Sequence, residues 1–254
     1  MITRRLWRIL KNPPETHPIM MRSIMQSNEY GIPWVIWIVL LPFSPMLIPL
    51  SILFAGTSYS ILWGVSISHQ IMQAKRGINY DLLCILPEGE YQLNWFITLG
   101  YLYRNPSFKN INGIGLWIVR LMLGFLMLQA VSNLQINVSA VIIIGFMMVG
   151  LFAHHFQAIG MGILFGMILP TYKLDHLSTT ILAFSIQTSI QVLSLVSVAL
   201  IGMALLHDAD NPVITGGICA VILLIYLCLR EFGLYTLWRS VIVRLSGDIM
   251  EFKM

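Results

Sequence analysis

The longest uncharged stretch of the sequence, residues 121–172, reads LMLGFLMLQAVSNLQINVSAVIIIGFMMVGLFAHHFQAIGMGILFGMILPTY and contains no Asp, Glu, Lys or Arg. A membrane-spanning helix needs about 20 predominantly apolar residues. The stretch is therefore long enough for two spans, with the polar segment SNLQIN at 132–137 as the turn between them. It predicts a pair of membrane-spanning helices.

Three further runs lack these charged residues, at 30–74, 176–207 and 211–229. The first fits two spans, because three prolines between 42 and 49 mark a turn in its middle. The other two runs fit one span each. The sequence thus predicts six spans, near residues 31–47, 50–72, 114–132, 138–165, 177–206 and 212–236.

The composition agrees with this fold class. Hydrophobic residues make up 57% of the 254 residues and charged residues only 10%, a mixture that cannot form the surface of a soluble protein. A membrane β-barrel would show short segments of alternating polarity instead of long apolar blocks. The chain is therefore expected to be an all-α polytopic membrane protein, one membrane domain over residues 1–254, embedded in the lipid bilayer.

The Lys and Arg residues outside the predicted spans all lie on one side of a six-span chain. They are Arg4, Arg5, Arg8, Lys11, Arg22, Lys75, Arg76, Arg104, Lys109, Lys173, Arg239, Arg244 and Lys253. The opposite loops, near 44–49, 132–137 and 207–212, carry none. Because short cytoplasmic loops are enriched in Lys and Arg, both termini are predicted to be cytoplasmic, in the inner membrane of a bacterium. The scattered basic residues form no nucleic-acid-binding domain.

Two arginines, Arg120 and Arg230, fall within predicted spans. Each is close enough to the cytoplasmic end for its side chain to extend along the helix and place the guanidinium at the membrane surface. The alternative is an intramembrane functional site formed by Arg120, or by Arg230 with Glu231.

Three cytoplasmic segments flank the spans. Within the N-terminal segment 1–30, residues 2–11 form an amphipathic pattern that predicts a helix lying on an anionic leaflet. The loop 73–113 is by far the longest, and its apolar stretch 91–103 is too short to cross, which predicts an interfacial or re-entrant helix. A basic tail occupies 238–254.

Residues 75–91, KRGINYDLLCILPEGEY, follow the second predicted span. Two cations would lie at the membrane surface, followed by a glycine able to end the helix. Residues 80–86 would then form a short amphipathic helix that ends before Pro87. A partner protein could push on such a helix, or the helix could simply cover the end of the bundle.

At these residues the sequence resembles the type-2 ABC-transporter permease family, whose members commonly leave their second span through a similar motif. The matching residues are Arg76, Gly77, Tyr80, Asp81, Leu82, Leu83 and Pro87. The layout is also similar, with an N-terminal interfacial helix, six spans, a large loop after the second span and a basic tail. In that family the loop is the coupling helix that docks into a separate ATPase subunit.

The resemblance implies the membrane subunit of an ABC exporter-like transporter. It would pair with a second six-span subunit and with a cytoplasmic ATPase. The residues that would couple to the ATPase are Arg76, Gly77, Tyr80, Asp81, Leu82, Leu83, Leu86, Pro87 and Glu88. The chain has no GxxxxGK[ST] phosphate-binding loop, so any ATP hydrolysis would belong to the partner, and we expect no enzyme activity in this chain.

Three histidines offer a rival interpretation. Counted from the outer ends of their spans, His69 on the second span and His154 or His155 on the fourth lie at similar depth. Such a pair could ligate a haem, or a single histidine a chlorophyll magnesium. The alternative is that they only donate and accept hydrogen bonds inside the bundle, and we therefore expect no bound cofactor.

The rival function is a non-transporting structural subunit of a larger redox or photosynthetic membrane complex. It draws on the histidines and on Ala74 and Lys75, which stand where the permease motif often has a Glu before the Arg. The three cysteines form no CxxC pair, so no metal site is expected. Glycines at 160, 162 and 166 are spaced for close helix packing.

Overall fold

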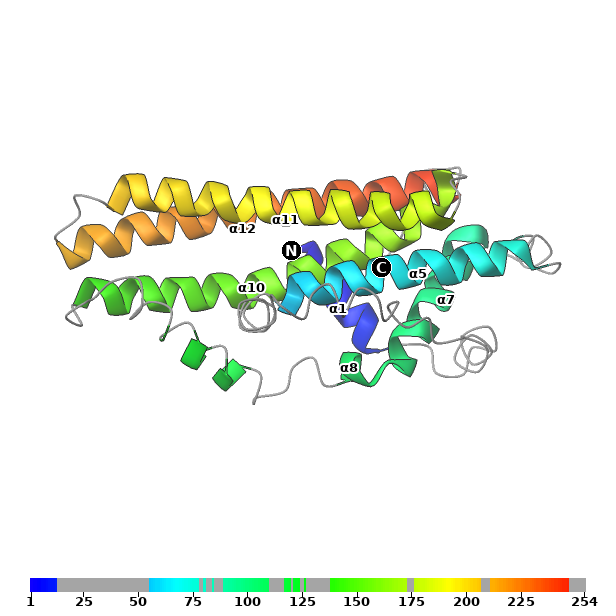
Figure 1. Ribbon diagram of the computed structural model, residues 1–254, viewed down its shortest axis with the longest axis horizontal. Coiled ribbons are helices and arrows are strands. Elements are labelled where there is room, and N and C mark those ends of the chain that lie inside the picture. The colour runs from blue at the N-terminus through cyan, green and yellow to red at the C-terminus, as the bar shows by residue number, and fades with distance from the viewer. Residues whose placement is uncertain are drawn as a thin grey trace.

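All the secondary structure is helical in the part of the chain that the computed structural model describes (Figure 1). This part comprises residues 1–12, 55–77, 80, 84, 89–109, 117–119, 121–123, 126, 138–172, 176–206 and 211–246. The elements are α1 (Ile2–Lys11), α5 (Ala55–Arg76), α7 (Gly89–Arg104), α8 (Pro106–Lys109), α10 (Val138–Ile168), the 3-10 helix η2 (Leu169–Tyr172), α11 (His176–Leu206) and α12 (Pro212–Ser246). The predicted all-α class is confirmed.

Among the residues that the structure describes, three helices are long and apolar enough to cross a membrane, over Val141–Tyr172, Phe184–Gly202 and Pro212–Leu245. They correspond to the predicted spans near 138–165, 177–206 and 212–236. The protein is therefore a helical membrane protein, with these three helices as its candidate spans.

The other three predicted spans are not established as spans. The one near 31–47 lies outside the described residues, and of 114–132 the structure describes only helical residues at 117–119, 121–123 and 126. The span near 50–72 corresponds to α5, which is 22 residues long but carries many Ser, Gly, His and Gln residues and is not among the apolar candidates. Six spans therefore stay a prediction.

Helices α5 and α10 run parallel to each other. The start of α5 lies beside the middle of α10, where Gly56 faces His155, and further along Gly64 faces Gly162. Since both residue numbers increase in the same direction, α5 lies along the C-terminal part of α10 (Figure 1).

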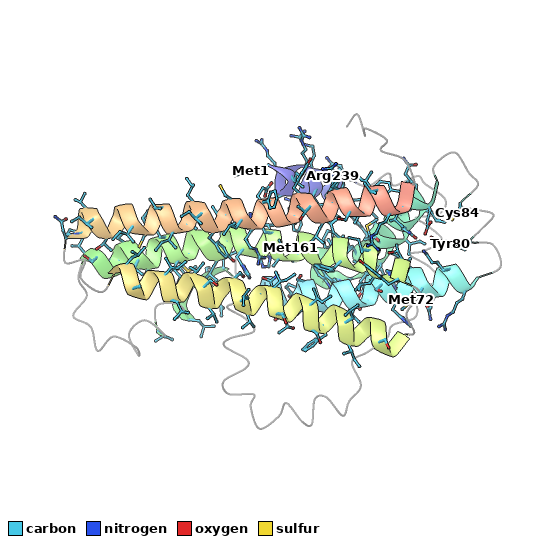
Figure 2. All side chains as sticks on the ribbon, turned by 90° about the horizontal axis from the view of Figure 1, so that it is seen from above. Met1, Met72, Tyr80, Cys84, Met161 and Arg239 are labelled. Atoms are coloured by element: carbon cyan, nitrogen blue, oxygen red, sulfur yellow. The ribbon has the colours of Figure 1, made fainter. Side chains whose placement is uncertain are left out.

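Helix α12 also runs parallel to α10, while α11 runs in the opposite direction. Gly150 and Gly160 of α10 approach Leu223 and Leu234 of α12, which sets the register. Short connections join α10 to α11 and α11 to α12, so α11 is antiparallel to both neighbours. The C-terminal ends of α5, α10 and α12 therefore lie at one end of the bundle. We call it the basic end, because Lys75, Arg76 and Arg244 lie there. Figure 2 shows Met72, Tyr80 and Cys84 gathered at this end.

The hydrophobic core is concentrated toward the basic end. Its buried side chains come from α1, α7 and α8, from Tyr80, from α5 beginning at Trp63, from the second half of α10 and from α12 beginning at Leu234. Large apolar side chains are exposed on the first half of α10, on α11 and on α12, including Val149, Leu193 and Leu224. Exposed apolar surface on this scale needs a lipid or protein environment to cover it.

Helix α1 has the amphipathic character predicted for residues 2–11. Leu6, Trp7 and Leu10 are buried, whereas its four cationic side chains are exposed. Trp7 Nε1 donates a hydrogen bond of 3.3 Å to the carbonyl oxygen of Phe156 on α10. The apolar face of α1 therefore packs against the protein, mainly on α10 and α12.

Candidate functional site

A seam of small residues holds α5 and α10 together. It is formed by Gly56, Ser60 and Gly64 on α5 and by Gly162 and Gly166 on α10. A Cβ atom built on Gly166 would lie 2.7 Å from the carbonyl oxygen of Gly64, which is closer than side-chain atoms tolerate. The Ser60 hydroxyl donates a 2.5 Å hydrogen bond to the carbonyl oxygen of Ala158 across the same seam. We call this contact the glycine seam.

The glycines predicted for close packing therefore include two that form this contact. Gly162 and Gly166 face α5, and a Cβ built on Gly160 would meet Leu6 of α1 and Leu234 of α12. The prediction of close helix packing is confirmed for all three.

At the end of the seam that is farther from the basic end, three helices share a histidine. His154 on α10 lies 2.9 Å from the hydroxyl of Thr57 on α5 and 2.5 Å from the hydroxyl of Tyr226 on α12, through its two ring nitrogens. In the neutral imidazole, one ring nitrogen donates a hydrogen bond and the other accepts one. The imidazole is buried, so its two contacts hold α5, α10 and α12 at a fixed spacing.

Arg230 extends this arrangement to α11. Its guanidinium lies 5.8 Å from the centre of the Tyr226 ring. The Nη1 atom donates to Gln191 Oε1 at 2.6 Å and to Ser194 Oγ at 3.4 Å. We call the six residues Thr57, His154, Tyr226, Arg230, Gln191 and Ser194 the polar network. It connects four helices in the interior of the bundle.

The expectation that Arg230 places its charge at the membrane surface is wrong. The residue is 4% exposed, and its guanidinium points sideways to α11 instead of along α12 toward the helix end. The polar side chains Gln191 and Ser194 supply acceptors that favour this direction. Glu231, the next residue, binds elsewhere, accepting hydrogen bonds from the backbone nitrogen and the hydroxyl of Thr3. Arg120 lies outside the described residues.

The expectation that His69 lies level with His154 and His155 is also wrong. His154 bonds to Thr57, and His69 follows Thr57 by twelve residues on the same helix, a rise of about 18 Å. Counting from the outer ends assumed that both helices begin at the same level. In fact Gly56, at the start of α5, lies beside His155, which is in the middle of α10 and not near its start at Val138. His69 therefore cannot bind the same metal ion as His154 or His155.

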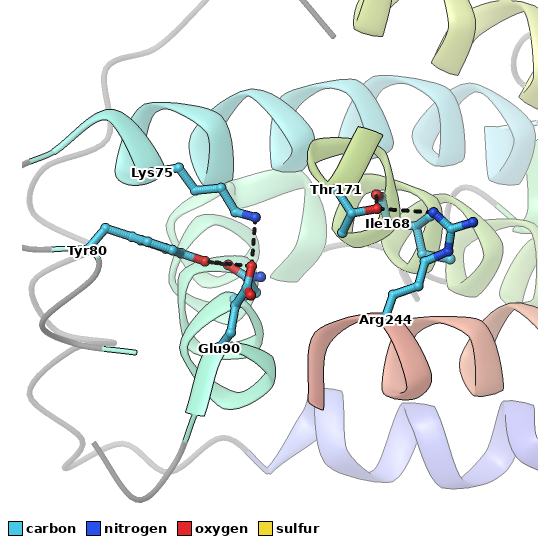
Figure 3. Close-up of polar contacts among 7 residues, drawn as sticks. Lys75, Tyr80, Glu90, Ile168, Thr171 and Arg244 are labelled. Carbon is cyan, nitrogen blue, oxygen red and sulfur yellow. Dashed lines mark hydrogen bonds and ion pairs between the residues drawn. The ribbon is translucent and has the colours of Figure 1, made fainter. Parts of the chain in front are cut away.

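The predicted coupling segment begins with a cluster of polar contacts at the basic end (Figure 3). Lys75 Nζ at the end of α5 lies 2.6 Å from Glu90 Oε1 at the start of α7. Tyr80 lies beside this pair, with its ring 5.7 Å from Lys75 Nζ and its hydroxyl donating to Asn94 Oδ1 at 2.8 Å. We call Lys75, Tyr80, Glu90 and Asn94 the loop clasp.

Burial of Tyr80 distinguishes it from the other motif residues that the structure describes. Its side chain is buried against α7, and burial together with the nearby Glu90 carboxylate raises the pKa of its phenol well above the ordinary value. Arg76 and Gly77 are exposed, and Gly77 closes a turn in which its amide donates to the carbonyl oxygen of Ala74. The remaining predicted coupling residues, Asp81, Leu82, Leu83, Leu86, Pro87 and Glu88, lie outside the described residues.

A second set of contacts fastens α12 at the same end. Arg244 Nη1 lies 3.5 Å from the hydroxyl of Thr171 in η2 (Figure 3). The Arg244 guanidinium also lies 4.4 Å from the centre of the Tyr172 ring. The Thr171 hydroxyl in turn donates to the carbonyl oxygen of Ile168. The end of α12 is thus attached to the turn that follows α10.

The apolar stretch predicted to form a short helix at 91–103 is helical, as part of α7. Most of its side chains are buried, and Trp95 meets Trp238 of α12 in an edge-to-face contact. Its position relative to a bilayer stays a prediction.

Across the described ranges, no group of three or more His, Cys, Asp or Glu residues is placed to hold a metal ion. Instead of metal ligands, the polar network contains a buried cation, Arg230, with hydrogen-bonding side chains around it. No family model matches the sequence, and comparison with curated proteins and with solved structures likewise finds no match.

Proposed function

We propose that this chain is a permease-type membrane subunit of an ABC exporter-like transporter, coupled to a separate cytoplasmic ATPase through residues 75–91. The observation that supports this function best is the loop clasp. It fastens both flanks of the segment to the bundle, because Lys75 lies in the last turn of α5 and Glu90 in the first turn of α7. A force on the segment would therefore act on two helices at once.

The glycine seam offers a route for that force. Helix α5 is in close backbone contact with α10 over several turns, so the two can move only as a unit. The polar network then joins α5 and α10 to α11 and α12. In this proposal the six spans form one subunit, the basic end faces the cytoplasm, and a second six-span subunit completes the transporter.

Copurification tests the proposal. The full chain, purified from its native membrane in mild detergent, should carry an ATPase subunit with it. Replacing Leu83 by Ala or Asp81 by Arg should release that subunit, because a leucine anchor in a docking groove contributes about 2 kcal/mol or more to binding. Leu193→Ala is the matched control, since this leucine is exposed and belongs to α11, outside residues 75–91.

The alternative function is a structural subunit of a larger redox or photosynthetic complex. The exposed apolar side chains of α11 and α12 favour it, since a neighbouring membrane protein could cover them. Copurification of other membrane subunits without an ATPase, unchanged in Leu83→Ala and Asp81→Arg, would support this alternative and contradict the transporter.

A further inference from the structure

Arg230 carries a buried positive charge with unused hydrogen-bonding capacity. Only 4% of the surface of this residue is exposed. Its Nη1 atom is bonded to Gln191 and Ser194, but its Nε and Nη2 atoms are buried without a hydrogen-bond partner in the described part of the chain. A guanidinium in a low-dielectric interior is strongly destabilised unless an anion accompanies it.

Gln191 adds another unused donor beside the guanidinium. Its Oε1 atom accepts the hydrogen bond from Arg230, which fixes the orientation of the amide. The Nε2 atom is then the remaining group, and it too is buried with no partner among the described residues. Three nitrogen atoms from two helices thus present only donors, and the group that complements them is an acceptor with negative charge.

The two acidic residues that the structure describes do not supply that charge. Glu231 is turned toward Thr3 of α1, from which it accepts two hydrogen bonds. Glu90 is engaged with Lys75 in the loop clasp at the basic end. Within the described ranges, Arg230 is therefore a cation whose nearest contacts are neutral.

We propose that Arg230 and Gln191 bind an oxyanion, a carboxylate or phosphate group, between α11 and α12. Arginine suits this ligand because its planar fork can donate two parallel hydrogen bonds to such a group. The oxyanion could belong to a lipid headgroup or to a free ion. This site does not depend on the transporter proposal, because a structural subunit could bind the same group.

The rest of the polar network positions the guanidinium. Tyr226 lies beside it, and the Tyr226 hydroxyl is held by His154, which also contacts Thr57. Rotation of the guanidinium is further limited by Gln191 and Ser194. A binding group held in this way loses little conformational freedom when the ligand arrives.

Thermal unfolding of the full chain tests the site. The protein is placed in dodecyl maltoside micelles, which contain no phosphate or carboxylate, at constant ionic strength, and its Tm is followed by tryptophan fluorescence. The added probes are dioctanoyl phosphatidic acid, inorganic phosphate and acetate, with dioctanoylglycerol as the uncharged lipid. A ligand that binds only the folded state raises Tm in a saturable manner. We expect at least one oxyanion to do so and dioctanoylglycerol to have no effect.

Variants assign the response to the site. Arg230→Gln should raise the apparent Kd about tenfold or more, the usual consequence of losing charged hydrogen bonds. Gln191→Leu keeps the charge but removes the Nε2 donor together with the Oε1 acceptor of Arg230, and should weaken binding by a smaller factor. Arg239→Gln, on the exposed side of the same helix, is the matched control and should respond like the wild type. If Arg230→Gln does not fold, Gln191→Leu and Arg230→Lys provide the comparison.

The outcomes separate the sources of the ligand. A response to phosphatidic acid alone identifies a headgroup, whereas a response to phosphate or acetate identifies a free ion, and either supports the site. The proposal is overturned if no oxyanion raises the wild-type Tm. It is overturned also if the Arg230 and Gln191 variants respond like the wild type, or if Arg239→Gln loses the response equally.

Discussion

Gly64 of α5 faces the carbonyl oxygen of Gly162 on α10 so closely that a Cβ atom built on Gly64 would lie 2.8 Å from that oxygen. Such an approach is possible only when one of the two residues has no side chain. The spacing between α5 and α10 is thus set by backbone contact, which leaves little room for one helix to slide or rotate on the other.

Gly64→Ala is expected to destabilise the protein by about 1–3 kcal/mol, because the added methyl group forces the two backbones apart. Gly202→Ala on α11 is the control, since nothing lies within 4 Å of its Cβ position. There the higher helix propensity of alanine should leave stability unchanged or raise it by up to about 1 kcal/mol. Denaturant titration in detergent measures both, and equal effects would contradict the glycine seam.

Loss of the ion pair in the loop clasp is expected to have a modest, salt-dependent effect. Lys75 and Glu90 are each about a third exposed or less, at 27% and 33%. A partly exposed pair of this kind contributes about 1 kcal/mol or less. A double-mutant cycle with Lys75→Gln and Glu90→Gln should give a coupling energy that falls at high salt. Arg76→Gln, at the exposed neighbouring residue, should show no coupling with Glu90→Gln.

Alkaline pH should weaken the basic end of the bundle through Tyr80 and Tyr91. Burial raises the pKa of both phenols above the ordinary value, and the Glu90 carboxylate adds to the effect at Tyr80. Their contribution to stability is complete below the unfolded-state pKa of about 10 and is lost as pH rises above it, because only the unfolded phenol ionises readily. Stability should fall by about 1.4 kcal/mol per pH unit for each group.

Tyr80→Phe tests the predicted loss of stability at alkaline pH. The variant should lose stability less steeply above pH of about 10, although it starts about 1 kcal/mol lower at neutral pH because the hydrogen bond to Asn94 is gone. Unfolding curves collected across the alkaline range provide the slopes. Identical slopes for wild type and variant would show that Tyr80 ionises as easily in the folded protein as in the unfolded one.

The start of α7 depends on a residue that can adopt a positive φ. Gly89 has a φ of 68° and nothing within 4 Å of its Cβ position, so only the backbone conformation restricts substitution there. Gly89→Ala should cost about 1 kcal/mol. Gly89→Asn should cost less, because Asn adopts this conformation more readily. Equal losses would indicate that the conformation is not what selects glycine.

Cysteine labelling tests the orientation of α12. Asn211 precedes the helix and Arg239 lies 28 residues later, a rise of about 42 Å that exceeds the hydrocarbon thickness of a bilayer. In a background without the three native cysteines, Asn211→Cys should react with an impermeant reagent from outside the cell. Arg239→Cys should react only after the membrane is opened, and the reverse pattern would invert the predicted topology.

The sequence predicted the long helices of this protein closely. Helices α10 and α11 begin within one residue of the predicted spans at 138 and 177, and α12 begins at the predicted residue, where Asn211 accepts a hydrogen bond from the amide of Val213. Uninterrupted apolar runs define such helices without reference to tertiary structure. The end of α12 was not predicted, since the helix continues to Ser246 through residues assigned to the tail.

The site was predicted much less well, because helical periodicity does not tell which faces of different helices meet. Arg230 was recognised as a charge within an apolar run, but its burial depends on Gln191, 39 positions earlier on another helix. Likewise, the relative depth of the histidines depends on the offset between α5 and α10. A Gln in an otherwise apolar span is a signal that would have placed Gln191 among the candidates.

The glycine seam also has a consequence for how the chain is made. Ser60 and Ala158 are 98 residues apart in sequence, so α5 leaves the ribosome long before its partner exists. At a synthesis rate of about 5–20 residues per second, the delay is roughly 5 to 20 s. During that interval α5, too polar to count among the apolar helices, has its serine and glycine face uncovered. Its stable packing therefore waits for α10, and a chain truncated before residue 138 should leave α5 exposed to quality-control proteases.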